Sequence, residues 1–289
     1  MNDDLIFRVP LGRWVDTFVD WLTDTFDAFF DGVGLALSWL FDAVALLLGE
    51  PTFWIVGAVL VAAAFLARGW KLALGSLLGL VVIYGVDQWD NAMDTLALVL
   101  VASLFAVVIG IPLGIWAARS STVSAVLRPI LDFMQTMPAF VYLLPAVILF
   151  RVGVVPGIVA TIIFAMAPGV RFTELGIRQV DKEVVEAGHA FGASPRRILR
   201  QIQIPLALPT IMAGINQVIM LALSMVVIAG MVGAPGLGQP VVQSLQSVQI
   251  GLGVEAGLAV VILAMYLDRV TAALGDRSPV ARALKLRAE

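Results

Sequence analysis

Long apolar runs without a charged residue are the feature that most constrains this sequence. The clearest run is Thr95–Ala118. A helix needs roughly 20 consecutive apolar residues to cross a bilayer, and a soluble domain has no use for a chain that is 60% hydrophobic and 13% charged. Only helices and closed barrels satisfy their backbone groups in lipid. Because these runs are continuous and do not alternate, they predict helices.

We therefore expect an all-α polytopic membrane protein with about seven transmembrane helices. The predicted spans are 51–67, 72–86, 95–118, 133–150, 152–170, 207–232 and 256–267, the last extended into the following turn. None of these ranges contains a charged residue. The glycine-rich stretch 233–238 predicts a turn at the membrane surface.

The first 50 residues are acidic and amphipathic. Aspartates recur there at helical spacing, and aromatic residues occupy the other faces; these aspartates are Asp16, Asp20, Asp24, Asp27 and Asp31. This pattern predicts a helix that lies in the membrane interface. The run 33–49 carries Asp42 near its middle, where a carboxylate in lipid would be costly. We therefore favour a second interfacial helix over a span at 33–49.

These patterns divide the chain into four parts. We expect an acidic amphipathic extension at 1–50 and two peripheral transmembrane helices at 51–90. A transmembrane core follows at 91–275, and a basic tail occupies 276–289. The core contains the polar, basic loop at 186–205.

The placement of basic residues predicts the orientation, because cytoplasmic loops carry an excess of lysine and arginine. With the 186–205 loop in the cytoplasm and the spans alternating, 15 of the 18 basic residues fall inside. Only Arg8, Arg13 and Arg151 fall outside. We expect a multi-pass protein of a bacterial cytoplasmic membrane with its N-terminus outside and its C-terminus inside.

The residue types present exclude several activities. None of the three lysines follows a glycine, so the chain has no phosphate loop of the GxxxxGK[ST] type. The absence of cysteine removes thiol nucleophiles and cysteine-zinc sites. The single histidine, His189, lies in the polar loop. The predicted spans contain no acidic residue or histidine, which is unlike the spans of proton-driven carriers. Because the phosphate loop and the usual nucleophiles and zinc ligands are missing as well, we expect a chain that is not an enzyme and holds no cofactor or metal.

The stretch Glu186–Pro205 predicts two short helices separated by a glycine. The first ends at Gly192, a good helix stop. Ser194 is a suitable N-cap for the second helix, and Pro195 suits its first turn. A basic helix–glycine–helix unit at a membrane surface is suited to binding a partner protein.

The spacing of this stretch resembles the cytoplasmic loop of ABC importer permeases, whose pattern is Glu-Ala-Ala, three residues, Gly, nine residues, Ile, one residue, Leu-Pro. Glu186, Ala187, Gly192, Ile202 and Pro205 fall on its positions. Two positions depart from it. Gly188 replaces the third residue of the motif, which loosens the first helix by up to ~1 kcal/mol relative to alanine, and Ile204 replaces the leucine.

Further blocks resemble one branch of that family, the permeases of glycine betaine/proline betaine importers and the similar choline permeases. These blocks are 109–120, 134–145, 191–199 and 206–231. The resemblance is close over 90–275 and looser over 14–89. It implies a type I ABC importer fold with an amphipathic N-terminal extension.

The resemblance also implies a mechanism and a set of partners. Two copies of the permease pair with two ATPase subunits, which bind ATP and magnesium, and a periplasmic or lipid-anchored binding protein delivers the solute. Membrane lipid surrounds the chain, and no nucleic acid is involved. The 186–205 loop is then the coupling loop. Its predicted ATPase-coupling residues are Glu186, Ala187, Gly188, Phe191, Gly192, Ala193, Ser194 and Pro195.

A few polar or helix-bending residues at membrane depth are candidates for lining the pathway. They are Gln135, Thr136, Pro138, Asn216 and Gln217. Polar side chains in spans either hold helices together or line a polar path, and the sequence leaves both interpretations open. Proline bends a span and frees backbone carbonyls, so Pro138 is either a packing kink or part of a gate.

The leading hypothesis is the permease subunit of an importer for betaine-type solutes. The nearest alternative is the same machine importing choline or another small polar solute. An ATPase-independent carrier or a scaffold is the alternative from another class, and it predicts a 186–205 loop that tolerates substitution.

Overall fold

The computed structural model describes residues 10–276, and this part of the chain contains helices and no strand. The helices before the central bend are α1 (Leu11–Gly49), α2 (Phe53–Arg68), α3 (Trp70–Gly85), α4 (Trp89–Arg119) and α5 (Ser121–Thr136). They are followed by η1 (Ala139–Tyr142), α6 (Leu143–Phe150), α7 (Val154–Arg178), α8 (Lys182–Ala190), α9 (Pro195–Ile198) and the π-helical η2 (Leu199–Gln203). The remaining helices are α10 (Ile204–Ser224), α11 (Val226–Gly230), α12 (Gly238–Ser247) and α13 (Ile250–Asp276).

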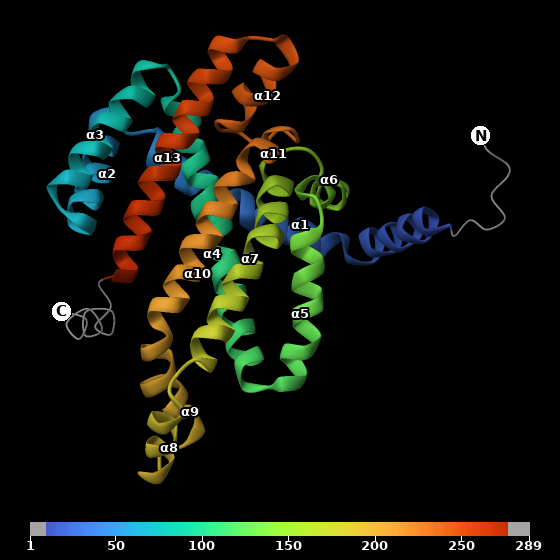
Figure 1. Ribbon diagram of the computed structural model, residues 1–289. Helices are drawn as coiled ribbons and strands as arrows, with labels where there is room; N and C mark the ends of the chain where they lie inside the picture. Colours follow the sequence, from blue (N-terminus) through green and yellow to red (C-terminus); the bar gives the residue numbers. More distant parts are fainter. Residues whose placement is uncertain (1–9, 277–289) are drawn as a thin grey trace.

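The long helices α4, α7, α10 and α13 form an elongated bundle (Figure 1). In the described residues, five helical segments are long and apolar enough to cross a membrane, and the bent pair formed by α5 and 139–150 raises the number to six. The helices α2 and α3 are apolar but shorter. The prediction of an all-α polytopic membrane protein is confirmed.

The predicted span 133–150 is wrong as a single helix. Helix α5 ends at Thr136, and the chain turns by 108° before η1 and α6. Met137 is extended, with φ −68° and ψ 136°. The residue before a proline is disfavoured in the α conformation because the proline ring crowds it. Pro138 therefore explains why the apolar run breaks here.

Two predicted spans, 152–170 and 256–267, extend beyond their predicted ends, whereas the run 207–232 is divided between α10, which ends at Ser224, and α11, which ends at Gly230. Helix α7 runs on to Arg178, so residues that the sequence assigns to the polar region continue the helix. Helix α13 likewise contains Glu255 and Asp268. The prediction that the spans carry no charge therefore holds for the predicted ranges but not for the helices that contain them. Charged groups at helix ends can lie outside the apolar layer, which hydropathy alone does not show.

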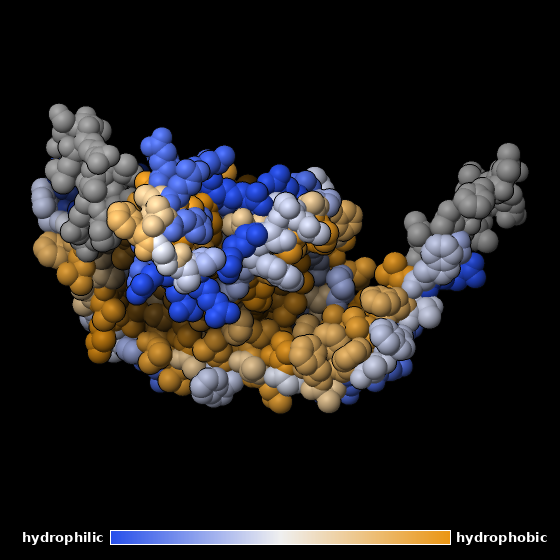
Figure 2. All heavy atoms as spheres, turned by 90° about the horizontal axis from the view of Figure 1, so that it is seen from below, coloured by the Kyte–Doolittle hydropathy of each residue, from blue (hydrophilic) through white to orange (hydrophobic). Residues whose placement is uncertain are grey.

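Helix α1 is one continuous element with a kink at Phe26, whose φ is −117° and ψ is 22°. It runs across the direction of the bundle and projects sideways from it in both views (Figures 1 and 2). The five aspartates of the extension are exposed, and so are aromatic side chains such as Trp14 and Phe29. Near its middle α1 is attached to α6 by an edge-to-face contact between Phe30 and Phe150, with centroids 5.7 Å apart. By length and composition α1 also qualifies as a span.

At the centre of the bundle α4 packs closely on α7, and α7 packs closely on α10; we call these two contacts the seam. The close approach of the helices depends on glycines at the points where they cross. A Cβ at Gly114 of α4 would lie 2.6 Å from the Val170 carbonyl oxygen, and one at Gly214 of α10 would lie 2.6 Å from the Phe172 Cβ. Small residues at such crossing points let helix backbones approach closely, and the van der Waals packing that results is one of the forces that associate helices in lipid. The seam therefore fixes these three helices relative to one another.

The stretch 233–238 forms a tight turn, as predicted, between α11 and α12. Gly233 and Gly236 have positive φ angles of 85° and 115°. The buried Thr95 hydroxyl of α4 accepts a hydrogen bond from the Leu237 amide at 2.8 Å. The turn is thus attached to the start of α4, at the opposite end of the bundle from α8 and α9 (Figure 1).

Candidate functional site: the helical loop between α7 and α10

The loop between α7 and α10 contains the two helices that the sequence predicts. Helix α8 begins after Asp181, whose carboxylate accepts a hydrogen bond from the Glu183 amide at 2.9 Å. It ends before Gly192, which has φ +75°. The Gly192 amide bonds the His189 carbonyl at 2.9 Å, and the Ala193 amide bonds the Gly188 carbonyl at 3.1 Å. This pair of bonds is the Schellman motif, in which glycine at the left-handed position ends a helix.

Helix α9 begins at Pro195, with Ser194 in the N-cap position as predicted. The Ser194 side chain makes no capping hydrogen bond. Its carbonyl oxygen instead accepts from the amides of Arg197 and Ile198, at 2.9 and 3.0 Å. The predicted side-chain cap at Ser194 is therefore wrong, although the helix start is right.

Helix α8 packs against α9 and η2 along one side only. A Cβ at Gly188 would lie 2.8 Å from the Ile202 Cδ1 atom and 3.4 Å from the Ile198 Cγ1 atom. Gly188 is thus the point at which the two arms of the loop approach each other. The Ile202 methyl group can rotate away, so the site accepts the alanine of the family pattern after a small adjustment.

The loop is attached to the bundle through a small apolar cluster. Leu199 and Ile198 are buried, and Leu199 packs with Ile177 of α7 and with Ala207 and Ile211 of α10. Residues of α4, including Ala118, complete this cluster. The cluster therefore joins η2 directly to α4, α7 and α10.

The opposite side of the loop is exposed. No residue of α8 is buried, and Glu186, Ala187, Gly192 and Pro195 are all exposed. Phe191, at the tip, is 92% exposed. Figure 2 shows hydrophilic residues gathered over this end of the molecule, with apolar surface on the flanks. Aromatic side chains are common anchors at protein interfaces, so Phe191 is a candidate for contact with a partner protein.

A charged network lies next to the loop, between α5 and α7. Glu174 is 5% exposed. Its carboxylate accepts from the Ser124 hydroxyl at 2.6 Å and pairs with Arg128 at 3.1 Å and Arg178 at 2.9 Å. The Arg178 guanidinium also donates to the Ala117 carbonyl at 2.8 Å, at the end of α4. Glu174 is not among the residues predicted from the sequence, although its spacing of four residues from Arg178 on one helix is a usable signal.

Comparison with known proteins places the chain in a family. Residues 110–277 match the family described as the binding-protein-dependent transport system inner membrane component. The chain is 49% identical over 273 residues to the glycine betaine transport system permease protein OpuAB of Bacillus subtilis, covering 93% of this chain and 95% of that one. It is 48% identical over 282 residues to the glycine betaine/carnitine transport permease protein GbuB of Listeria monocytogenes, covering 93% and 97%.

The chain belongs to this family of inner-membrane permeases. The fold agrees with that assignment. The permease is similar to a chain from inward-facing conformations of the MetNI methionine ABC transporter, with a TM-score of 0.56 and 25% identity over 66% of this chain and 92% of that one. The resemblance inferred from the sequence blocks is thereby confirmed, as is the type I importer fold.

The structure separates the pathway candidates of the permease into two groups. Asn216 is partly buried and is bonded between helices: its amide donates to Asp268 of α13 at 3.0 Å, and its carbonyl oxygen accepts from the Thr271 hydroxyl. It therefore holds α10 to α13. Gln135, Thr136 and Pro138 lie exposed at the break after α5, and Gln217 is exposed on α10. Asp268 and Thr271 were not predicted, because no sequence pattern pairs them with Asn216.

Proposed function

We propose that the permease is the membrane-spanning subunit of an ATP-driven importer for glycine betaine/proline betaine-type compatible solutes, and that it forms the translocation pathway for them. The observation that carries the proposal is the identity of 48–49% to two glycine betaine permeases over more than nine-tenths of each chain. A permease for trimethylamine N-oxide, from Ruegeria pomeroyi, is 39% identical. The trimethylated nitrogen is the chemistry that these solutes share with carnitine and choline.

The proposed assembly contains two copies of the permease, two ATPase subunits and a substrate-binding protein. ATP and magnesium are bound by the ATPase subunits. The exposed face of the 186–205 loop docks on the ATPase, with Phe191 at its centre and Glu186, Ala187, Gly188, Gly192, Ala193, Ser194 and Pro195 around it. The cluster at Leu199 supports this role, because it gives the loop a direct mechanical connection to the bundle.

The proposed orientation places this loop in the cytoplasm and the N-terminus outside. Arg119 and Arg178 end the helices α4 and α7 next to this loop, and Arg68 and Lys71 flank the turn between α2 and α3, at the ends of those helices that are nearer to the loop. This placement supports the orientation because basic residues concentrate on the cytoplasmic side. Gln135, Thr136, Pro138 and Gln217 are proposed to face the pathway. Their exposure on α10 and at the break after α5 supports this, since uncharged polar groups let a zwitterion pass without holding it.

The test is uptake of labelled glycine betaine into proteoliposomes that contain the permease, its cognate ATPase and its binding protein. We expect uptake that requires ATP and that unlabelled carnitine or choline reduces less than unlabelled glycine betaine does. Phe191→Ala should weaken coupling about tenfold or more, as the loss of an interface anchor does. Trp14→Ala removes another exposed aromatic residue, from α1, and should leave uptake unchanged.

Each outcome decides one part of the proposal. If choline stimulates ATP hydrolysis and glycine betaine does not, the assignment as an ATP-driven importer stands, and the assignment of glycine betaine as the solute is wrong. If Trp14→Ala and Phe191→Ala have equal effects, the loop is not the docking surface. If the permease transports the solute without an ATPase, it is a stand-alone carrier and the proposal fails.

A further inference from the structure

The groove between α3 and α13 has the features of a binding site for a lipid headgroup. We propose that it binds one anionic phospholipid, from the leaflet in which the turn between α2 and α3 lies. The proposal concerns the fold and its membrane, and it does not depend on which solute the permease carries. Its evidence is the shape of the groove, the position of three cations and one buried hydroxyl group.

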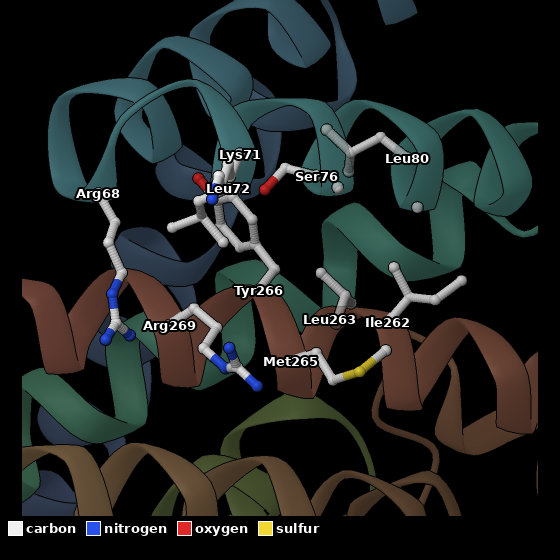
Figure 3. Close-up of a pocket in the computed structure, with 12 residues that line it drawn as sticks. Arg68, Lys71, Leu72, Ser76, Leu80, Ile262, Leu263, Met265, Tyr266 and Arg269 are labelled. Atoms are coloured by element: carbon white, nitrogen blue, oxygen red, sulfur yellow. The ribbon is translucent and has the colours of Figure 1, made fainter.

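The groove has a cavity volume of about 540 Å³. Its walls are apolar side chains of α3 and α13, with Leu72 and Leu80 on one side and Ile262, Leu263 and Met265 on the other. Figure 3 shows the three cationic side chains toward one end of the groove and Leu80 and Ile262 toward the other. An amphipathic ligand with a charged end and an apolar end fits this arrangement.

The groove is a wedge because the two helices meet at one glycine and part at another. A Cβ at Gly79 would lie 2.6 Å from the Ile262 Cγ2 atom, so α3 and α13 touch there. A Cβ at Gly75, one turn nearer the cations, would meet nothing within 4 Å. The groove therefore opens toward the end of α3 at which the cations lie, which is where a lipid would enter it.

Three cations surround the open end. Arg68 is the last residue of α2, Lys71 lies in the first turn of α3, and Arg269 lies near the end of α13. One carboxylate is close: Asp268 Oδ2 is 3.8 Å from Arg269 Nε, and Asp268 also accepts from Asn216. The open end thus keeps an excess of positive charge. Basic pockets between transmembrane helices at the cytoplasmic side suit phospholipid headgroups.

Ser76 carries a buried hydroxyl group that a lipid could bind. It is 7% exposed, it lines the groove, and its hydroxyl group has no hydrogen-bond partner. Buried hydroxyl groups almost always have a partner. Ser76 is five residues beyond Lys71, or roughly 7.5 Å deeper along the helix. That depth suits donation to an ester carbonyl of a lipid whose phosphate lies among the three cations.

The Tyr266 hydroxyl closes the inner side of the groove. It donates to the Leu60 carbonyl of α2 at 2.9 Å. It is therefore committed to holding α13 against α2, and Ser76 is the unpartnered donor at this depth. The surrounding membrane supplies the occupant without a second protein, since the flanks of α2 and α3 carry exposed apolar side chains such as Trp54 and Leu78.

The experiment measures lipids that remain bound to the full chain. The protein is purified from membranes containing equal amounts of phosphatidylglycerol and phosphatidylcholine, delipidated with mild detergent, and analysed by native mass spectrometry. We expect one phosphatidylglycerol per permease to be retained in preference to phosphatidylcholine. In Lys71→Gln and in Arg68→Gln/Lys71→Gln, retention should fall about fivefold for each cation removed.

Two further variants separate a built site from general attraction of charge. Gly75→Phe fills the groove without changing the charge, and it should abolish retention. Gly85→Phe is its matched control, because Gly85 lies on the same helix, also has open space around its Cβ position, and does not line the groove. Arg119→Gln is the control for charge, since Arg119 is an exposed basic residue at the end of α4 and does not line the groove.

Equal retention of the two lipids by the native chain, or no retention, overturns the proposal. So does a loss in the charge variants with none in Gly75→Phe, which would indicate attraction at the surface only. Loss in Gly75→Phe with normal retention in Gly85→Phe and Arg119→Gln supports it. Size-exclusion profiles identify any variant that fails to fold, and Ser76→Ala, the smallest change in the groove, then replaces it and should reduce retention.

Discussion

The α4–α7 seam and the 186–205 loop both contain glycine at critical points, and the two regions use it differently. At Gly114 in the seam there is no room for a Cβ, since the Val170 carbonyl oxygen would be 2.6 Å away. At Gly192 in the loop there is ample room, because nothing lies within 4 Å, but φ is +75°. The seam therefore needs the small size of glycine, whereas the loop needs its conformational freedom. The difference separates a closely packed transmembrane centre from an exposed loop that we propose as the docking surface.

We expect the largest loss of stability from a substitution in the seam. Gly114→Ala should destabilise the protein by about 1–3 kcal/mol, because an added methyl group in a packed contact forces a shift of the backbone. Gly75→Ala is the matched control on α3, where a Cβ meets nothing. Thermal unfolding in detergent should show a clear fall in Tm for Gly114→Ala and none for Gly75→Ala. Equal Tm values for the two variants would show that the seam is looser than the structure describes.

We expect the next largest loss of stability from a substitution in the charged network beside the loop. Glu174→Gln keeps the shape and removes the charge that Arg128 and Arg178 share, at a cost of about 1–2 kcal/mol. Asp132→Asn is the comparison, because Asp132 also pairs with an arginine, Arg171, but its side chain is 63% exposed. Exposed pairs contribute about 0–1 kcal/mol. A larger loss of Tm in Asp132→Asn than in Glu174→Gln would contradict this ranking.

Substitution of Gly192 in the loop should reduce stability moderately. The cause is its positive φ angle, because a Cβ at this position would not contact any neighbouring atom. Gly192→Ala should cost about 1 kcal/mol, since a left-handed conformation disfavours a Cβ. Gly192→Asn should cost less, because asparagine tolerates that conformation. Comparison of the two Tm values tests the Schellman motif directly. If alanine and asparagine are equivalent, the positive φ of Gly192 is not what ends α8.

We expect the smallest change in stability from a substitution at Ser194. Ser194→Ala should change stability by less than about 0.5 kcal/mol, because its side chain makes no cap. Ser120 begins α5 and accepts from the Val123 amide at 3.3 Å, so Ser120→Ala should cost about 1 kcal/mol. Tm measurements on the two variants compare a serine that caps its helix with one that only occupies the position.

The spans and the loop could be predicted because each depends on local sequence. Hydropathy locates the apolar runs, and glycine at 192 with proline at 195 marks the two helices of the loop. A bend at Pro138 was predicted, but the complete end of α5 at Thr136 and the 108° turn that follows were not, because the apolar run continues without a charged residue. Continuation of α7 through Glu174 was missed because hydropathy treats a charged residue as the end of a span. The Asn216–Asp268–Thr271 contact joins distant segments, and a single sequence carries no local signal of such a contact.

The most direct test of the central claim uses the natural absence of cysteine from the chain. A single cysteine is introduced as Phe191→Cys and treated with a thiol-to-amine cross-linker in the presence of the cognate ATPase. Trp14→Cys, at an exposed aromatic position of α1, is the matched control. We predict a cross-link from position 191 to the ATPase and none from position 14. A complex that assembles but gives no cross-link at 191, or equal cross-links at both positions, would contradict the assignment of the loop as the docking surface.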